Sequence, residues 1–157
     1  MMDKLETLID LLTRGELERD ELAYRVARVR DAGSDAELAW LRDEGQPRLM
    51  QASLLLRLQD VLLASDQLDM LHERISDSLG EPLPPFPSDR RDFWSDDYFE
   101  WLDEIVAARG LEIMMLPDSF EDKLAALVVR REDTSRILVL ADALKLIVEK
   151  STQRRYA

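Results

Sequence analysis

The chain has 157 residues, a formal net charge of −12, one histidine and no cysteine. A chain of this length can bury a core without disulfides or a structural metal, and it is the size of one domain. The absence of cysteine excludes a disulfide scaffold and any thiolate-bound zinc or iron–sulfur site. Since 46% of the residues are hydrophobic, the composition argues against general disorder, and we expect a single domain over residues 1–157.

The charge bears on the class of partner. Nucleic acids and anionic membranes select Lys and Arg, so an excess of acids disfavours both. It suits a basic protein partner, because opposite potentials speed encounter, although many cytoplasmic proteins are simply acidic. The first residues do not resemble a secretory signal, because Asp3, Glu6 and Asp10 interrupt them, and no segment is apolar enough to span a membrane. We therefore predict a cytoplasmic protein; the sequence does not indicate its oligomeric state.

Helical periodicity dominates residues 1–80. Apolar residues recur at i, i+3, i+4 and i+7 over residues 3–14, and again over residues 16–30 after Gly15. Ser34 and Glu37 form a capping-box pattern, which predicts a third helix ending near residue 45.

The fourth predicted helix is the longest. Pro47 suits its first turn, and apolar residues at helical spacing continue to about Leu79. Ser65 and Asp66 stand in the middle of this run and could divide it into two helices.

Residues 81–91 contain four of the six prolines, so a helix cannot continue through them. They predict a stiff, extended connection between a helical half, residues 1–80, and a second half, residues 92–150.

The second half alternates between helical and strand patterns. Ser95 or Asp96 can cap a helix through residue 109, and two strands are predicted at 111–116 and 123–130. Asp133 or Thr134 can cap a last helix, although residues 136–141 could instead form a third strand. Residues 144–150 could extend that helix or form a short strand. The predicted fold is α+β and predominantly α, with an N-terminal helical bundle packed against a small α-β-β-α unit.

The segment from Asp92 to Glu104 holds six acids and no base, and residues 93–101 hold five of the ten aromatic residues. Aromatic side chains often anchor protein interfaces. We expect Phe99 and Trp101 in the core, whereas Trp94, Asp97 and Tyr98 fit either the core edge or a partner-facing surface. The predicted partner-binding residues are Trp94, Asp96, Asp97, Tyr98, Glu100, Asp103 and Glu104.

Signals for catalysis are weak. His72 is the sole histidine, and its place in a helical stretch indicates a solvent-edge or capping-region residue. No nucleophile elbow, phosphate-binding glycine motif or EF-hand loop is present. Asp97, Glu100 and Glu104 share a helical face and could bind a cation weakly or act as acid and base, but such faces are usually only solvated. We predict no cofactor, no metal and no enzymatic activity.

From residue 92 to residue 146 the chain resembles an uncharacterised family of small bacterial proteins. The resemblance rests on the helix W-x-D-D-Y-F-x-W-L at 94–102, the glycine and strand at 110–113, the A-L-V-V-R strand at 126–130, and Glu132-Asp133 before the last helix. It implies the order helix, strand, strand, helix. It also implies a role of the kind played by immunity proteins against secreted toxins, with no catalytic residue to carry over.

The resulting hypothesis is a non-enzymatic acidic binding protein, in its sharpest form an immunity or antitoxin protein that neutralises a basic partner. The alternatives are an adaptor or secretion chaperone, a nucleic-acid mimic that blocks a basic groove, and an enzyme that uses carboxylates or a metal.

Overall fold

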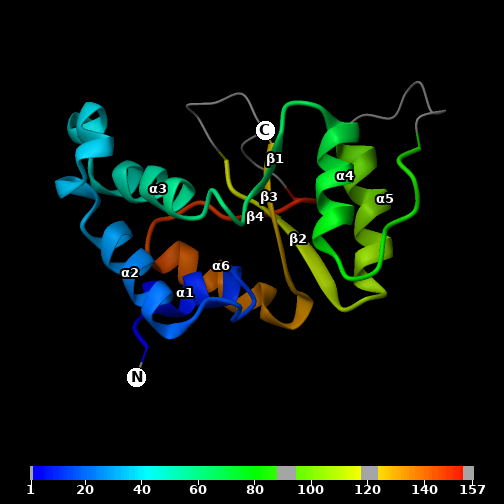
Figure 1. Cartoon of the computed structure of the whole chain (residues 1–157), viewed down its shortest axis with the longest axis horizontal. Coiled ribbons are helices and arrows are strands. Elements are labelled where there is room, and N and C mark those ends of the chain that lie inside the picture. The colour runs from blue at the N-terminus through cyan, green and yellow to red at the C-terminus, as the bar shows by residue number, and fades with distance from the viewer. Residues whose placement is uncertain (1, 88–94, 118–123, 154–157) are drawn as a thin grey trace.

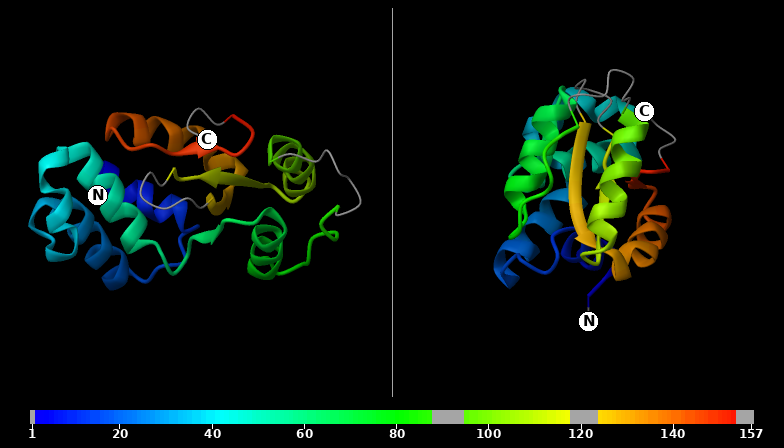
Figure 2. Two further views of the ribbon diagram at one scale, coloured as in Figure 1. Left: turned by 90° about the horizontal axis from the view of Figure 1, so that it is seen from above. Right: turned by 90° about the vertical axis from the view of Figure 1, so that its right-hand side faces the viewer.

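The structure is a computed structural model that describes residues 2–87, 95–117 and 124–153. It confirms the predicted class, since the fold is α+β and predominantly helical, with helices on both faces of an antiparallel sheet (Figures 1 and 2). In chain order the elements are α1 (Lys4–Leu12), α2 (Arg19–Arg30), the 3-10 helices η1 (Ala32–Ser34) and η2 (Ala36–Glu44), α3 (Gln46–Arg57), β1 (Leu63–Ser65), α4 (Leu68–Ser78), α5 (Ser95–Ala107), β2 (Leu111–Met115), β3 (Leu124–Arg130), η3 (Arg131–Asp133), α6 (Thr134–Ala143) and β4 (Glu149–Lys150).

The first two helices follow their local signals. Asp3 caps α1, because its carboxylate accepts a hydrogen bond from the backbone N–H of Glu6 at 2.9 Å. Gly15 adopts a φ of 68°, which glycine reaches without strain. The backbone N–H of Glu16 donates to Thr13 O in the same turn, so α2 begins at Arg19 rather than at residue 16.

The third predicted helix is a 3-10 helix, and its predicted cap is wrong. Asp35, not Ser34, accepts the backbone N–H of Glu37, at 3.0 Å. Arg57 and Arg28 hold the Asp35 carboxylate in that position through hydrogen bonds of 2.5 and 3.2 Å. The cap is therefore fixed by side chains that are distant in sequence.

The prediction of one continuous helix over residues 47–79 is also wrong, and the alternative of a division near Ser65 is nearer to the structure. α3 ends at Arg57, and residues 63–65 form β1, which pairs with β3 in the register Leu63↔Ala126. The reason is tertiary, because β3 supplies backbone partners that no local pattern reveals.

The sheet has the order β1-β3-β2-β4. Its centre is the β2–β3 hairpin, which the sequence predicts as two strands. The expected two-stranded ribbon is widened on one side by β1 and on the other by β4, which pairs with β2 in the register Met115↔Glu149. Residues 134–143 are helical as predicted, and residues 149–150 adopt the strand alternative.

Two cores lie on opposite faces of the sheet, since successive strand residues point to opposite sides. On β3, Leu127 faces a core built with α1, α2, α3 and α6, whereas Val128 faces a core built with α4 and α5. Figure 1 shows these two groups of helices on either side of the strands. Both cores draw residues from before and after the proline-rich connection, so the two predicted halves interlock.

The connection is described as far as Pro87, and its remaining residues 88–91 lie outside the described part. Leu83 is buried, and its N–H donates to Ser76 Oγ of α4 at 3.0 Å. Arg109 donates to the carbonyls of Glu81 and Pro82 at 2.5 and 2.9 Å. The prolines thus run along α4 and past the end of α5. Among the described residues, none of the helices combines the length and hydropathy needed to cross a membrane.

Candidate functional site

The predicted acidic residues of α5 lie on its outer side. Asp96, Asp97, Glu100 and Glu104 are exposed, while the buried side of the helix carries Phe99, Leu102 and Val106. Three- and four-residue spacing places such acids on neighbouring turns of one face. The structure therefore brings together four of the seven predicted partner-binding residues.

The other three predicted residues have different positions. Asp103 is half-buried and accepts a hydrogen bond from Arg131 at 2.5 Å, so it ties α5 to η3. Tyr98 is fully buried, so the interpretation of its ring as a partner-facing anchor is wrong. Trp94 lies outside the described residues.

A second row of acids lies on α4, and the sequence analysis missed it. Asp69, Glu73 and Asp77 are exposed at i, i+4 and i+8, and Arg74 is the one basic residue of this helix. The spacing was readable in the sequence. What could not be read is that α4 and α5 lie on the same face of the sheet, at one end of the molecule (Figures 1 and 2). We call the exposed acids of the two helices the acidic face: Asp69, Glu73, Asp77, Asp96, Asp97, Glu100 and Glu104.

His72 joins α4 to α5 beneath this face. Its Nδ1 lies 2.8 Å from the hydroxyl oxygen of Tyr98, and its Nε2 lies 2.7 Å from the carbonyl oxygen of Pro84. Only 4% of the residue is exposed, so the prediction of a solvent-edge histidine is wrong. The side chain connects α4, α5 and the proline-rich connection at one point.

The partners of His72 fix its tautomer. A carbonyl oxygen only accepts hydrogen bonds, so Nε2 carries a proton and donates it to Pro84. In the neutral ring, Nδ1 then accepts the hydroxyl proton of Tyr98. Burial raises the pKa of the Tyr98 hydroxyl above its ordinary value, so the phenol stays protonated at neutral pH.

An aromatic cluster surrounds this pair. The rings of Trp101, Tyr98 and Phe86 have centroids 5.5, 5.6 and 5.9 Å from that of His72. These distances are within the range of favourable aromatic packing. Trp101, which we expected in the core, is only half-buried and packs against the core formed with α4 and α5.

This arrangement limits the chemistry available. The sole histidine is occupied at both nitrogens and is buried, so it offers no free base to a substrate. Within residues 2–87, 95–117 and 124–153, no three His, Cys, Asp or Glu side chains are grouped to hold a metal ion. What α4 and α5 present at the surface is mainly negative charge, from seven exposed carboxylates against one arginine.

We predict that calcium, magnesium and zinc at millimolar concentration leave the melting temperature unchanged. An ion that binds the folded state alone must raise stability by mass action. The measurement is a thermal melt with and without each ion. An upward shift that disappears in the variant Asp97→Asn/Glu100→Gln would contradict the prediction.

Comparisons with protein-family models, with curated proteins and with solved structures find no match to this chain. The resemblance of residues 92–146 to the family of small bacterial proteins therefore stays a prediction.

Proposed function

We propose that this chain is a non-enzymatic binding protein of the immunity or antitoxin type, which neutralises a basic protein partner through the acidic face. The observation that carries the proposal is the charge of that face. α4 and α5 together contain eight carboxylates and one arginine, and seven of the carboxylates are exposed. Two adjacent helices with this excess create a negative potential that attracts a basic surface and raises its rate of encounter.

A rigid support is a second reason. Binding costs less when the binding surface is already ordered. α5 is fixed to the sheet by Phe99 and Leu102, which are fully buried, and to α4 by the hydrogen bond between Tyr98 and His72. The acids therefore stand on a framework that need not rearrange.

A role as an inhibitor also fits the lack of a free reactive histidine near the acidic face. An inhibitor needs a complementary surface but no reactive group, and the histidine nearest the acidic face is engaged at both nitrogens. The proposal includes a cytoplasmic location, where such an inhibitor would meet its target.

The first experiment is affinity purification from the native cell with three forms of the protein. These are the wild type, the variant Glu73→Gln/Glu100→Gln on the acidic face, and the control Glu18→Gln/Asp20→Asn on α2 and its N-cap. Both variants lose two exposed acids, so they match in net charge. We expect a basic protein that the wild type and the control recover and the acidic-face variant loses.

With the recovered partner, association kinetics provide a quantitative prediction. Glu73→Gln/Glu100→Gln should lower the on-rate roughly fivefold at low salt, because exposed charges act mainly through steering. The control pair should change it much less, and added salt should reduce the difference. An equal effect of both pairs, or a larger effect of the control, would move the interface to the N-terminal helices. The absence of any recovered partner in all three forms would count against an inhibitor.

A further inference from the structure

One edge of the sheet is open beside a groove. β4 is the last strand in the order β1-β3-β2-β4, and residues 146–148 run into it. On its inner side the segment is satisfied. Ile147 donates its N–H to Gln51 Oε1 at 2.8 Å and accepts from Gln51 Nε2 at 3.0 Å, and Ser151 donates its N–H to Ile113 O at 3.0 Å.

The outer side of the same segment is different. Backbone groups in a strand alternate in direction, so if Ile147 and Glu149 face inward, Val148 and Lys150 face outward. The Lys150 carbonyl accepts from the N–H of Gln153 at 3.0 Å. The N–H and C=O of Val148 have no hydrogen-bond partner within the described part of the chain. One complete backbone pairing position at this edge is therefore unused among the described residues, while Val148 as a whole is 7% exposed and belongs to the core that includes Ile137 and Ala141 of α6.

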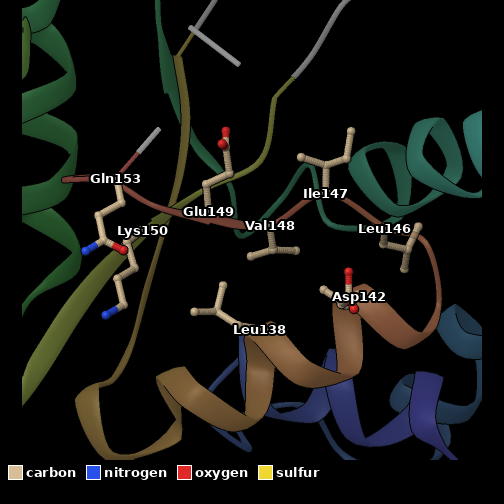
Figure 3. Close-up of a pocket in the computed structure, with 9 residues that line it drawn as sticks. Leu138, Asp142, Leu146, Ile147, Val148, Glu149, Lys150 and Gln153 are labelled. Carbon is tan, nitrogen blue, oxygen red and sulfur yellow. The ribbon is translucent and has the colours of Figure 1, made fainter. Parts of the chain in front are cut away.

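The groove lies between this segment and α6, and its volume is about 640 Å³. Figure 3 shows Leu138 of α6 and Val148 pointing toward one another across it, with Asp142 beneath Leu146 and Ile147 and with Lys150 at the opposite end. Leu146, Val148 and Lys150 share the side that faces α6, as alternation requires. A strand added against Val148 would project alternate side chains into the same space.

We propose that this groove binds an extended segment of a partner protein, which adds to the sheet at Val148 as a further strand. An apolar side chain of the segment enters between Leu138 and Val148, and a basic side chain two residues away lies at Asp142. Main-chain pairing supplies affinity and the alternate side chains supply specificity, as in other cases of strand addition. The site is separate from the acidic face, so the inference stands whether or not that face neutralises a basic partner.

Charge favours a basic segment over a second copy of this chain. Each copy carries a formal charge of −12, so pairing of two edges would bring like charges together. Asp142 is exposed at the rim and attracts Lys or Arg, whereas Lys150 repels them at the opposite end of the groove, so a basic side chain is expected at Asp142 only. The apolar side chains of the groove exclude a wholly charged segment.

The test uses the full chain and two synthetic peptides, acetyl-Thr-Val-Thr-Lys-Thr-amide and the same peptide with Glu in place of Lys. Nuclear magnetic resonance follows the backbone amides during titration to about 5 mM peptide, since isolated five-residue strands bind weakly. We expect the Val148 amide to shift and its hydrogen exchange to slow. The lysine peptide should bind about threefold more tightly than the glutamate peptide, as expected for one exposed ion pair.

Two variants test whether the peptides bind at Asp142 and Val148. Asp142→Asn changes an exposed side chain and should abolish the preference for lysine while leaving the fold intact. Val148→Pro removes the outward N–H and should abolish binding of both peptides. If Val148→Pro does not fold, the response to Asp142→Asn decides alone. The proposal is overturned by the absence of shifts with both peptides, by shifts confined to another face, by equal affinity for the two peptides, or by self-association of the wild type that Val148→Pro abolishes.

Discussion

Replacing Asp35 with alanine should destabilise the fold by about 3–5 kcal/mol, because it leaves the largely covered Arg57 with only its 3.4 Å contact to Glu37. The Asp35 side chain is 2% exposed, and its carboxylate bonds Arg57 at 2.5 Å and Arg28 at 3.2 Å. It also accepts the N–H of Glu37 and so caps η2. One substitution therefore removes two ion pairs and a cap.

Urea denaturation at pH 7 measures this loss. Asp43→Ala is the matched control, since Asp43 is an exposed acid on the same 3-10 helix, and a surface substitution of this kind changes stability by about 0.5 kcal/mol or less. A loss of less than about 1 kcal/mol in Asp35→Ala would show that the buried network contributes little beyond its own desolvation.

The same carboxylate predicts a pH dependence. Burial opposes its ionisation most strongly, but the hydrogen bonds from Arg57 and Glu37 and the charges of Arg57 and Arg28 outweigh burial, so the pKa of Asp35 lies below its ordinary value of 3.8. A lowered pKa in the folded state gives stability that is fully present above the ordinary value and is lost as the pH falls through the folded one. The stability difference between wild type and Asp35→Asn should therefore persist at pH 5 and shrink below pH 3.8.

The second large effect is expected at His72. His72→Leu keeps the volume near constant but leaves the Tyr98 hydroxyl and the Pro84 carbonyl without their partner. A buried polar group without a hydrogen bond costs about 1–3 kcal/mol, so the loss should be about 2–4 kcal/mol. Because His72 also joins α4 to the proline-rich connection, amide exchange should rise at Glu81, Leu83 and Phe86, the residues of that stretch that carry an N–H, more than in β3.

A double-mutant cycle separates the two hydrogen bonds. Tyr98→Phe should cost about 1–2 kcal/mol, since it leaves Nδ1 of His72 unpaired. In His72→Leu/Tyr98→Phe both members of the His72–Tyr98 hydrogen bond are gone and only the Pro84 carbonyl loses its partner. The combined loss should therefore be about 1 kcal/mol smaller than the sum of the two single losses. Additive losses would mean that the 2.8 Å contact does not couple α4 to α5.

The sequence predicted the α5 part of the acidic face but not the α4 part. The density of acids from residue 92 to residue 104, and their helical spacing, predicted an exposed row on one helix, and Asp96, Asp97, Glu100 and Glu104 are exposed. Local pattern could not distinguish Tyr98 from its acidic neighbours, because its burial depends on His72, which is 26 residues away in sequence. The acids of α4 belong to the acidic face only because α4 packs on the same side of the sheet as α5.

The sequence by itself determined the elements whose signals are local. Helical periodicity, the break at Gly15 and the strong strand patterns of β2 and β3 all act within a few residues, so α1, α2, α5, α6 and the central hairpin were predicted correctly in type. The predominantly helical α+β class followed from these elements.

Only the tertiary structure decided the rest, since the deciding interactions join residues far apart in the chain. Residues 63–65 are a strand because β3 offers them backbone partners, and residues 149–150 are a strand because β2 does. Asp35 displaces Ser34 as a cap because Arg28 and Arg57 converge on it. The open edge at Val148 likewise exists only once Gln51, 96 residues from its partner Ile147, has occupied the inner side of that segment.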